Sequence, residues 1–186
     1  MKQLLKKIRN TLRSWLGVDY GPTLWDMQEM GLKIGKNFKA DKPRIDISHC
    51  WLISIGDNVV FGPNVYLLAH DASTKPYLGY TKIGRVNIGD NTFIGADAVV
   101  MPGVSIGNNC IIGTASVVTR DIPDNTVYAG NPARFICTIE DYLEKNRNLL
   151  KTNPVYDYSY TLGGGITPEK KEQMKKELET GMGYVK

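Results

Sequence analysis

The stretch that decides the fold is residues 88–123, which read IGDNTFIGADAVVMPGVSIGNNCIIGTASVVTRDIP. An aliphatic residue recurs at every sixth position of this stretch: Ile88, Ile94, Val100, Ile106, Ile112 and Val118. A six-residue period matches neither the 3.6-residue period of a helix nor the two-residue alternation of a half-buried strand. It predicts a triangular coil in which each face is a short strand and three hexapeptides complete one turn.

The repeat also predicts how the coils are held together. Each aliphatic residue would stack on its counterpart in the next coil, and no coil could bury its own aliphatic residues alone. The Gly and Asn residues of Ile-Gly-Asp-Asn are expected at the corners, where a positive φ costs these residue types little. The same pattern occurs earlier, in a different phase, over residues 55–67. We therefore predict an all-β solenoid over residues 31–136.

The repeat is interrupted after Leu67. Leu67 and Ile88 lie 21 residues apart where an unbroken pattern would need six, so about 15 residues, roughly 72–86, are expected to loop out of the coil. Long loops on a compact scaffold are usually functional or disordered. The aromatic residues Tyr77 and Tyr80 suit contact with a sugar; the alternative is a loop that packs against a neighbouring subunit.

His70 and Asp71 lie at the entrance to this loop and are the candidate catalytic pair. An acyl transfer to a hydroxyl needs a base for the hydroxyl proton, and a neutral imidazole is the usual one. Asp71 could orient the imidazole, although adjacent strand residues point to opposite faces, so it could equally hold the loop. His49 lies 21 residues before His70 and is expected on the neighbouring coil, with either an acceptor-binding or a structural role.

Residues of about 30–136 resemble the hexapeptide-repeat acetyltransferases, which include galactoside, maltose and virginiamycin acetyltransferases and sugar O-acetyltransferases of polysaccharide loci. The resemblance is most specific over residues 88–95 and over Val118-Thr119-Arg120-Asp121-Ile122-Pro123 with Gly130-Asn131-Pro132-Ala133-Arg134. It implies a left-handed parallel β-helix, a homotrimer, acetyl-coenzyme A as co-substrate, and His70 as the general base.

The resemblance also implies a donor site in the groove between two subunits. It assigns the pantetheine arm to Ala96 and Thr114, and the nucleotide end to Thr119, Arg120 and Arg134. Arginine suits phosphate because its guanidinium offers several fixed donors. The chain departs from the family pattern at Cys137, where relatives often have a second basic residue.

Both ends of the chain are expected to be helical. Residues 1–30 form an N-terminal segment with a basic amphipathic helix over residues 2–16, which would pack on the trimer or lie on an anionic membrane surface. Residues 137–186 form a C-terminal helical tail, with a capping box at Thr138-Ile139-Glu140-Asp141 and a last helix that begins at Thr167-Pro168.

Composition limits the remaining function classes. The net charge of +4 comes from the five Lys and Arg residues of positions 1–18, which argues against nucleic-acid binding. Three cysteines without CxxC spacing predict reduced thiols in a cytoplasmic protein. Two histidines are too few for the three-histidine zinc site of a β-helix carbonic anhydrase, so no metal is expected.

The sequence thus predicts an acetyl-coenzyme A-dependent O-acetyltransferase that acts on a sugar or saccharide hydroxyl. An antibiotic hydroxyl is the alternative acceptor, and an amine would be served by the same base. A non-catalytic β-helix scaffold is the alternative outside enzymes; it should not bind acetyl-coenzyme A.

Overall fold

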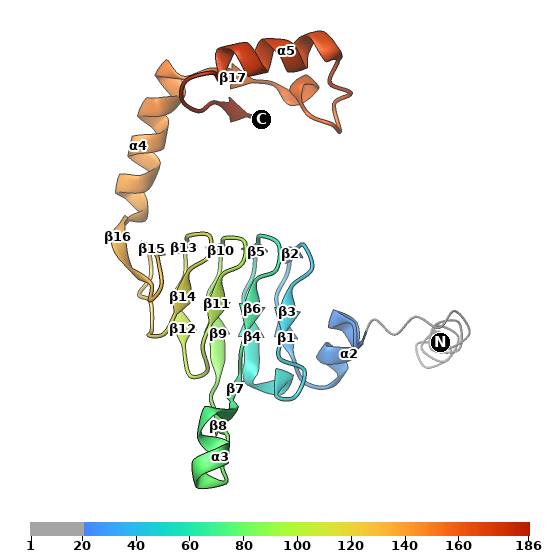
Figure 1. Cartoon of the computed structure of the whole chain (residues 1–186), viewed down its shortest axis with the longest axis vertical. Coiled ribbons are helices and arrows are strands. Elements are labelled where there is room, and N and C mark those ends of the chain that lie inside the picture. The colour runs from blue at the N-terminus through green and yellow to red at the C-terminus, as the bar shows by residue number, and fades with distance from the viewer. Residues whose placement is uncertain (1–20) are drawn as a thin grey trace, which may run out of the picture. The chain divides into compact units, whose positions relative to one another are not determined.

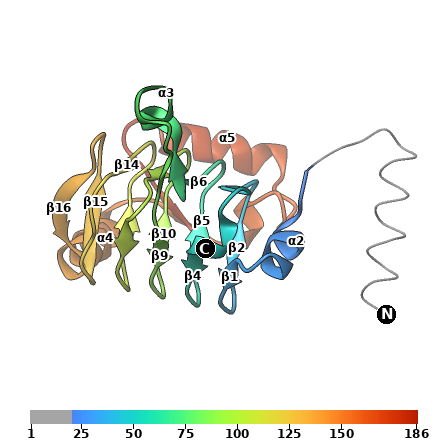
Figure 2. The same ribbon diagram turned by 90° about the horizontal axis from the view of Figure 1, so that it is seen from below.

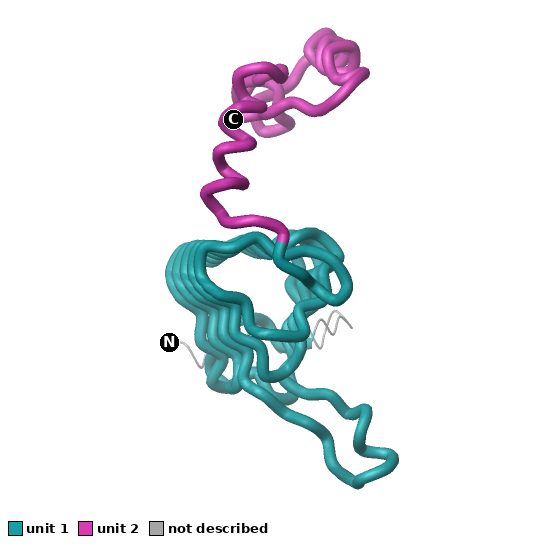
Figure 3. The backbone as a smooth tube through the Cα atoms, turned by 90° about the vertical axis from the view of Figure 1, so that its left-hand side faces the viewer, with its two compact units in different colours: residues 1–135 teal, residues 136–186 magenta. Residues whose placement is uncertain are grey.

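The computed structural model describes residues 21–186, so the expected helix over residues 2–16 lies outside the described residues. The chain divides into two compact units, Met1–Phe135 and Ile136–Lys186 (Figure 3). The first unit contains the hexapeptide repeat, and the second contains most of the helical tail.

Three parallel sheets form the sides of the coil in the first unit (Figure 1). The first sheet has the order β1 (Lys33–Ile34), β4 (Ile53–Ile55), β9 (Val86–Ile88) and β12 (Ser105–Ile106). The second has the order β16 (Arg134–Thr138), β15 (Thr126–Ala129), β13 (Ile111–Ile112), β10 (Phe93–Ile94), β5 (Val60–Phe61) and β2 (Lys39–Ala40), and its pairings from β15 to β2 are parallel. The third has the order β14 (Val117–Val118), β11 (Val99–Val100), β6 (Tyr66–Leu67) and β3 (Arg44–Ile45). Successive strands along the chain thus belong to different sheets, as a triangular coil requires.

The repeated aliphatic residues fill the interior of the coil. Ile94 pairs in register with Phe61 on one side and with Ile112 on the other, and Ile94 and Ile112 are completely buried. Val100 lies between Leu67 and Val118 in the same way. The stacking that the six-residue period predicts is confirmed.

The corners are built differently for asparagine and for glycine. Asn58, Asn91 and Asn109 have φ values of 56°, 54° and 53°, and the Asn58 side-chain amide donates to Asn91 Oδ1 at 3.1 Å. Gly89 does not adopt a positive φ; a Cβ there would lie 2.6 Å from the Gly107 carbonyl carbon. The prediction of positive φ is therefore right for asparagine and wrong for this glycine, which is needed because adjacent coils approach closely.

The coil spacing departs from 18 residues in three places, one of which is the last coil, where Ile111 pairs with Val127, 16 positions away. Val99 pairs with Val117, 18 positions away, whereas Tyr66 pairs with Val99, 33 positions away. The additional residues form a hairpin (Figures 1 and 2) of β7 (His70–Asp71), η2 (Ala72–Thr74), α3 (Lys75–Leu78) and β8 (Lys82–Ile83). One coil earlier, Arg44 pairs with Tyr66, 22 positions away, and a loop with η1 (Cys50–Leu52) takes up the difference.

The remaining elements lie at the two ends of the described chain. The helix α2 (Leu24–Glu29) precedes β1 and has a capping box at Thr23. The strand β16 (Arg134–Thr138) leads into the second unit, which contains α4 (Ile139–Thr152), β17 (Val155–Tyr156), η3 (Tyr158–Tyr160), α5 (Pro168–Glu177) and β18 (Tyr184–Val185). Thr138 caps α4 through the predicted capping box, and Thr167 caps α5. Within residues 21–186, no helix is long and apolar enough to cross a membrane.

Candidate active site

The candidate site lies where the two coil insertions meet. His70 begins the inserted hairpin at β7, and its ring Nδ1 lies 2.5 Å from Asp46 Oδ2. Asp46 directly follows β3, and only 2% of its side chain is exposed, against 33% for His70. Asp46 also accepts the backbone N–H of Ala69 on Oδ2 and that of Ser48 on Oδ1, each at 3.0 Å. The buried carboxylate is thus fixed by backbone donors before it meets the imidazole.

This geometry determines which nitrogen of His70 is free. The Asp46 oxygens are acceptors, so His70 Nδ1 carries the proton and donates to Oδ2. The lone pair therefore remains on Nε2, and the partly exposed ring can offer it to a substrate. A carboxylate that fixes the tautomer and orientation of a catalytic imidazole plays the same part in hydrolase triads.

Asp71 has other partners. Its carboxylate lies 2.5 Å from Lys82 Nζ and accepts the Ser73 backbone N–H at 2.8 Å. The hydrogen bond from Lys82 and those from Ser73 lower the pKa of Asp71 to about 2. Asp71 and Lys82 also pair across β7 and β8. The interaction with the imidazole that was considered for Asp71 is made by Asp46, and Asp71 joins the two strands of the hairpin.

Sequence reasoning missed Asp46. It lies 24 residues before His70, at a point where the coil has no hexapeptide pattern to follow. The signal available was the 21-residue offset between His49 and His70, which places the segment around Asp46 beside Ala69 and His70. Asp46 follows Ile45, the last strand residue before this loop, and its position there would have made it a candidate partner for His70.

His49 lies on the neighbouring coil, as the offset predicts. Its ring centroid is 5.4 Å from that of His70 and 5.4 Å from that of Trp51. Its Nδ1 is buried and has no hydrogen-bond partner among the described residues. Asp46, His49 and His70 each place one ligand atom within 4.8 Å of the others, so these are the residues that could hold a metal. The hydrogen bonds that Asp46 already accepts favour the pairing with His70 instead.

The distal part of the hairpin is α3, which contains Tyr77 and is followed by Tyr80, whereas β7, which begins with His70, lies at its root (Figure 1). The side chains of Tyr77 and Tyr80 are 86% and 80% exposed. The Thr74 hydroxyl donates to the Tyr80 carbonyl oxygen at 2.8 Å and holds the end of α3. The chain itself leaves both aromatic rings free to contact another molecule.

The predicted donor-site residues fall into two groups. Arg120 and Arg134 line one pocket of about 320 Å³, together with Asp121, Tyr128 and Phe135. The Asp121 carboxylate accepts the Ser105 backbone N–H at 2.7 Å. Thr119 is exposed next to Arg120. Ala96 and Thr114 instead belong to one stack of corners, where the Ala115 N–H donates to the Ala96 carbonyl at 2.8 Å. The structure thus brings the two arginines together and places the pantetheine candidates on adjacent coils.

Comparison with known proteins agrees with this architecture. Residues 85–120 match the family model described as bacterial transferase hexapeptide (six repeats). The chain is 38% identical over 123 residues to a galactoside O-acetyltransferase of Escherichia coli, which covers 64% of this chain and 60% of that protein. It is 36% identical over 126 residues to protein CapG of Staphylococcus aureus, which covers 64% of this chain and 73% of that protein.

A solved structure is also similar. A galactoside acetyltransferase in complex with coenzyme A has a TM-score of 0.52 and 27% identity, over 75% of this chain and 83% of that one. The chain spans about 60% of the length of the Escherichia coli relative. With the stacked coils and the matched repeats, these similarities show that the chain belongs to the hexapeptide-repeat acetyltransferase family.

Proposed function

We propose that the protein transfers an acetyl group from acetyl-coenzyme A to a hydroxyl group of a sugar or saccharide. The observation that carries this proposal is the pairing of Asp46 with His70, because it orients a partly exposed imidazole and leaves its Nε2 as a base. The galactoside O-acetyltransferase relative supports a saccharide acceptor, and the coenzyme A complex of the structural neighbour supports the donor.

Each residue of the candidate site has a separate role in this reaction. His70 Nε2 takes the proton of the acceptor hydroxyl while its oxygen forms a bond to the thioester carbonyl carbon. The tetrahedral adduct then breaks its carbon–sulfur bond, and the imidazolium returns the proton to the departing thiolate. Asp46 keeps the imidazole in one tautomer and stabilises its charged form. Asp71 holds the root of the hairpin on which His70 lies.

For the donor we propose that Arg120 and Arg134 contact the phosphates and that Thr119 contacts the adjacent nucleotide end. Two guanidinium groups in one pocket suit phosphate oxygens because they supply several charged hydrogen bonds. Ala96 and Thr114 would contact the pantetheine arm along the stacked corners. The acyltransferase domain in this proposal is residues 31–136, with residues 137–186 as an appended tail.

We also propose a left-handed coil and a homotrimer. The outward side chains of the second sheet include Val60, Phe93 and Ile111, and those of the third include Tyr66, Val99 and Val117. Two apolar faces on one triangular coil allow one face of a copy to pack on a different face of the next copy. Such head-to-tail contacts form a ring when the rotation from copy to copy closes. The number of three copies and the left hand of the coil rest on the resemblance to the hexapeptide-repeat acetyltransferases.

The proposed activity is tested by incubating the purified protein with acetyl-coenzyme A and a panel of mono- and oligosaccharides. The expected result is release of free coenzyme A that depends on an acceptor. The product should be about 42 Da heavier than the acceptor, because one acetyl group replaces one hydrogen. Absence of acceptor-dependent release, together with no measurable binding of acetyl-coenzyme A, would reject the proposal in favour of a scaffold.

A further inference from the structure

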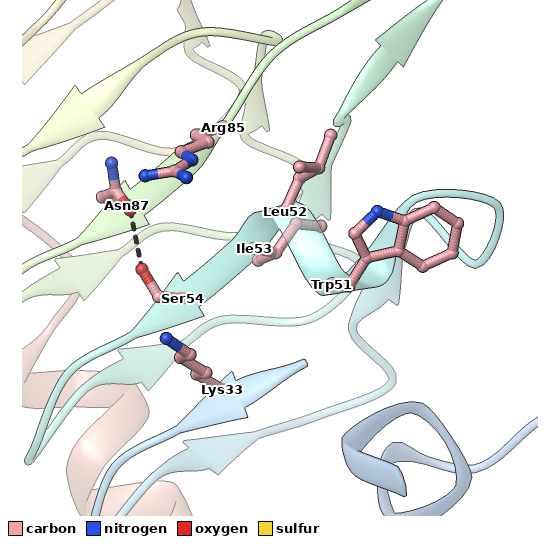
Figure 4. Close-up of a pocket in the computed structure, with 7 residues that line it drawn as sticks. All are labelled: Lys33, Trp51, Leu52, Ile53, Ser54, Arg85 and Asn87. Carbon is pink, nitrogen blue, oxygen red and sulfur yellow. Dashed lines mark hydrogen bonds between the residues drawn. The ribbon is translucent and has the colours of Figure 1, made fainter. Parts of the chain in front are cut away.

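A second pocket of about 280 Å³ lies on the outer face of the first sheet (Figure 4). Its lining residues are Lys33, Trp51, Leu52, Ile53, Ser54, Arg85 and Asn87. The lining contains two cations and no acid. Neither Lys33 nor Arg85 forms an ion pair within residues 21–186, so both charges are available to a ligand.

Residues on two sides of the pocket are neighbours of the candidate active site. On one side Trp51 lines the pocket, and its ring lies 5.4 Å from the ring of His49, which is itself 5.4 Å from that of His70. On the other side Arg85 directly follows the end of the inserted hairpin. There Ile83 pairs with His70, and the Gly84 N–H donates to the Ala69 carbonyl at 3.0 Å.

The floor of the pocket is polar and ordered. The Ser54 hydroxyl donates to Asn87 Oδ1 at 2.7 Å, and Asn87 Nδ2 donates to Ser105 Oγ at 3.1 Å (Figure 4 shows the first of these bonds). Trp51 is 52% exposed and offers an aromatic surface at the other end of the pocket, beyond Leu52 and Ile53 (Figure 4). A flat aromatic ring and hydrogen-bonding groups in one pocket suit a ring-shaped polar ligand.

The first sheet differs from the other two sheets of the coil. Its outward residues are Lys33, Ser54, Asn87 and Ser105, whereas the outward residues of the second and third sheets are mostly apolar. A polar face is poorly suited to the packing of subunits, because its groups would need new partners when water is excluded. The first sheet is therefore the face that remains open to substrate.

We propose that this pocket binds the acceptor, and that the acceptor is a saccharide with an oxyanion, either a carboxylate or a phosphate. The oxyanion lies between Lys33 and Arg85, and the sugar ring lies against Trp51 with its reacting hydroxyl toward His70. The inference rests on the proposed function and narrows it from saccharides in general to acidic ones. Lys33, Arg85 and Trp51 thus determine specificity, whereas His70 performs the proton transfer.

The test compares matched acidic and neutral ligands by binding and by turnover. The acidic probes are the methyl glycosides of glucuronate, galacturonate and mannuronate, together with the corresponding hexose 1-phosphates; the neutral probes are the methyl hexosides. Binding is measured by calorimetry in the absence of acetyl-coenzyme A. At least one acidic probe should bind about tenfold or more tightly than its neutral partner, the scale of a charge-assisted hydrogen bond. Uronates and phosphates distinguish the two sources of negative charge.

Variants test whether a preference for acidic over neutral probes comes from this pocket. Lys33→Gln with Arg85→Gln should remove the preference, so that the acidic probe binds no more tightly than its neutral partner. Lys171→Gln, an exposed lysine of α5, is the control and should keep the preference. The preference should also weaken as salt is raised, because exposed charges are screened.

The outcomes separate this inference from the proposed function. If acidic and neutral saccharides are acetylated with equal kcat/KM, or if the control removes the preference as strongly as the double variant, the pocket assignment is wrong and the activity stands. If acidic probes bind through Lys33 and Arg85 without any acetyl transfer, the pocket stands and the proposed activity falls. If no acidic probe binds more tightly than its neutral partner, the inference is overturned.

Discussion

The reactivity of the candidate site depends on which nitrogen of His70 is free. Asp46 lies 2.5 Å from Nδ1 and is itself held by the N–H groups of Ser48 and Ala69. The carboxylate therefore acts through the imidazole and is a positioning residue. It should influence turnover more than the binding of acetyl-coenzyme A.

Asp46→Asn should lower kcat by at least about tenfold while the KM for acetyl-coenzyme A changes little, since the amide can support the wrong tautomer of the imidazole. Steady-state kinetics measure both values, and Asp157→Asn, which changes the carboxylate that caps η3 in the second unit, is the matched control. In a His70→Ala background the Asp46→Asn change should have almost no further effect on kcat. An equal loss of kcat in that background would mean that Asp46 does not act through His70.

Single residues were predictable from the sequence only where a pattern or a resemblance constrained them. His70 and the two arginines of the donor pocket followed from motif position, and the structure shows each in a setting that suits the proposed role. Asp46 and Trp51 did not, because both lie in the loop after β3 that interrupts the repeat. A periodic pattern carries no information about segments that leave the coil.

The inserted hairpin is the element that carries His70, and its root is fastened by Asp71. The carboxylate pairs with Lys82 on the opposite strand and caps η2 through the Ser73 N–H. The pKa of Asp71 is lowered to about 2, chiefly by the hydrogen bond from Lys82. Because the folded-state value lies below the ordinary one, this pairing stabilises the hairpin above about pH 4 and loses its effect as the pH falls through about 2.

The Ser73 amide resonance should report this titration in NMR spectra recorded from pH 6 downward. We expect a shift with a midpoint of about 2 in the wild-type chain and no corresponding shift in Asp71→Asn. The variant should also be cut faster by trypsin after Lys82, because the root of the hairpin is loosened. A wild-type midpoint near the ordinary value for aspartate, about 3.9, would contradict the pairing with Lys82.

The regular elements were predictable because one physical requirement repeats along them. Every coil must stack an aliphatic residue on the next coil, so Ile88 to Val118 reveal the strands, and the 21-residue gap after Leu67 reveals the insertion. The internal structure of the insertion was not predictable, because a short helix and a two-residue strand pair leave no period to detect. The close approach of adjacent coils at Gly89 likewise appears only when the coils are placed together.

At the scale of the whole molecule, the three outer faces of the coil differ in chemistry. The second and third sheets present apolar side chains, and the first presents polar and cationic ones. Burial of exposed apolar area drives association of subunits. The proposed trimer therefore uses the second and third faces and leaves the first face open.

Phe93→Lys places a charge in the centre of the apolar row on the second sheet, where the Phe93 side chain is 44% exposed. Sedimentation equilibrium should show that this variant dissociates to smaller species at concentrations at which the wild-type chain is a trimer, because a lysine buried in that contact would have no partner. Ser105→Lys, on the outer face of the first sheet, is the control and should remain trimeric. If Ser105→Lys dissociates and Phe93→Lys remains a trimer, the interface lies on the first face, and the placement proposed here is wrong.

The central claim is that His70 is the base in an acetyl transfer from acetyl-coenzyme A to a saccharide hydroxyl. The most direct measurement is kcat/KM for the best acceptor in the wild-type protein and in His70→Ala, with the fold of both checked by circular dichroism. We predict a loss of about 100-fold or more in His70→Ala, the scale expected for removal of a general base. Unchanged kcat/KM in a folded His70→Ala protein would contradict the account.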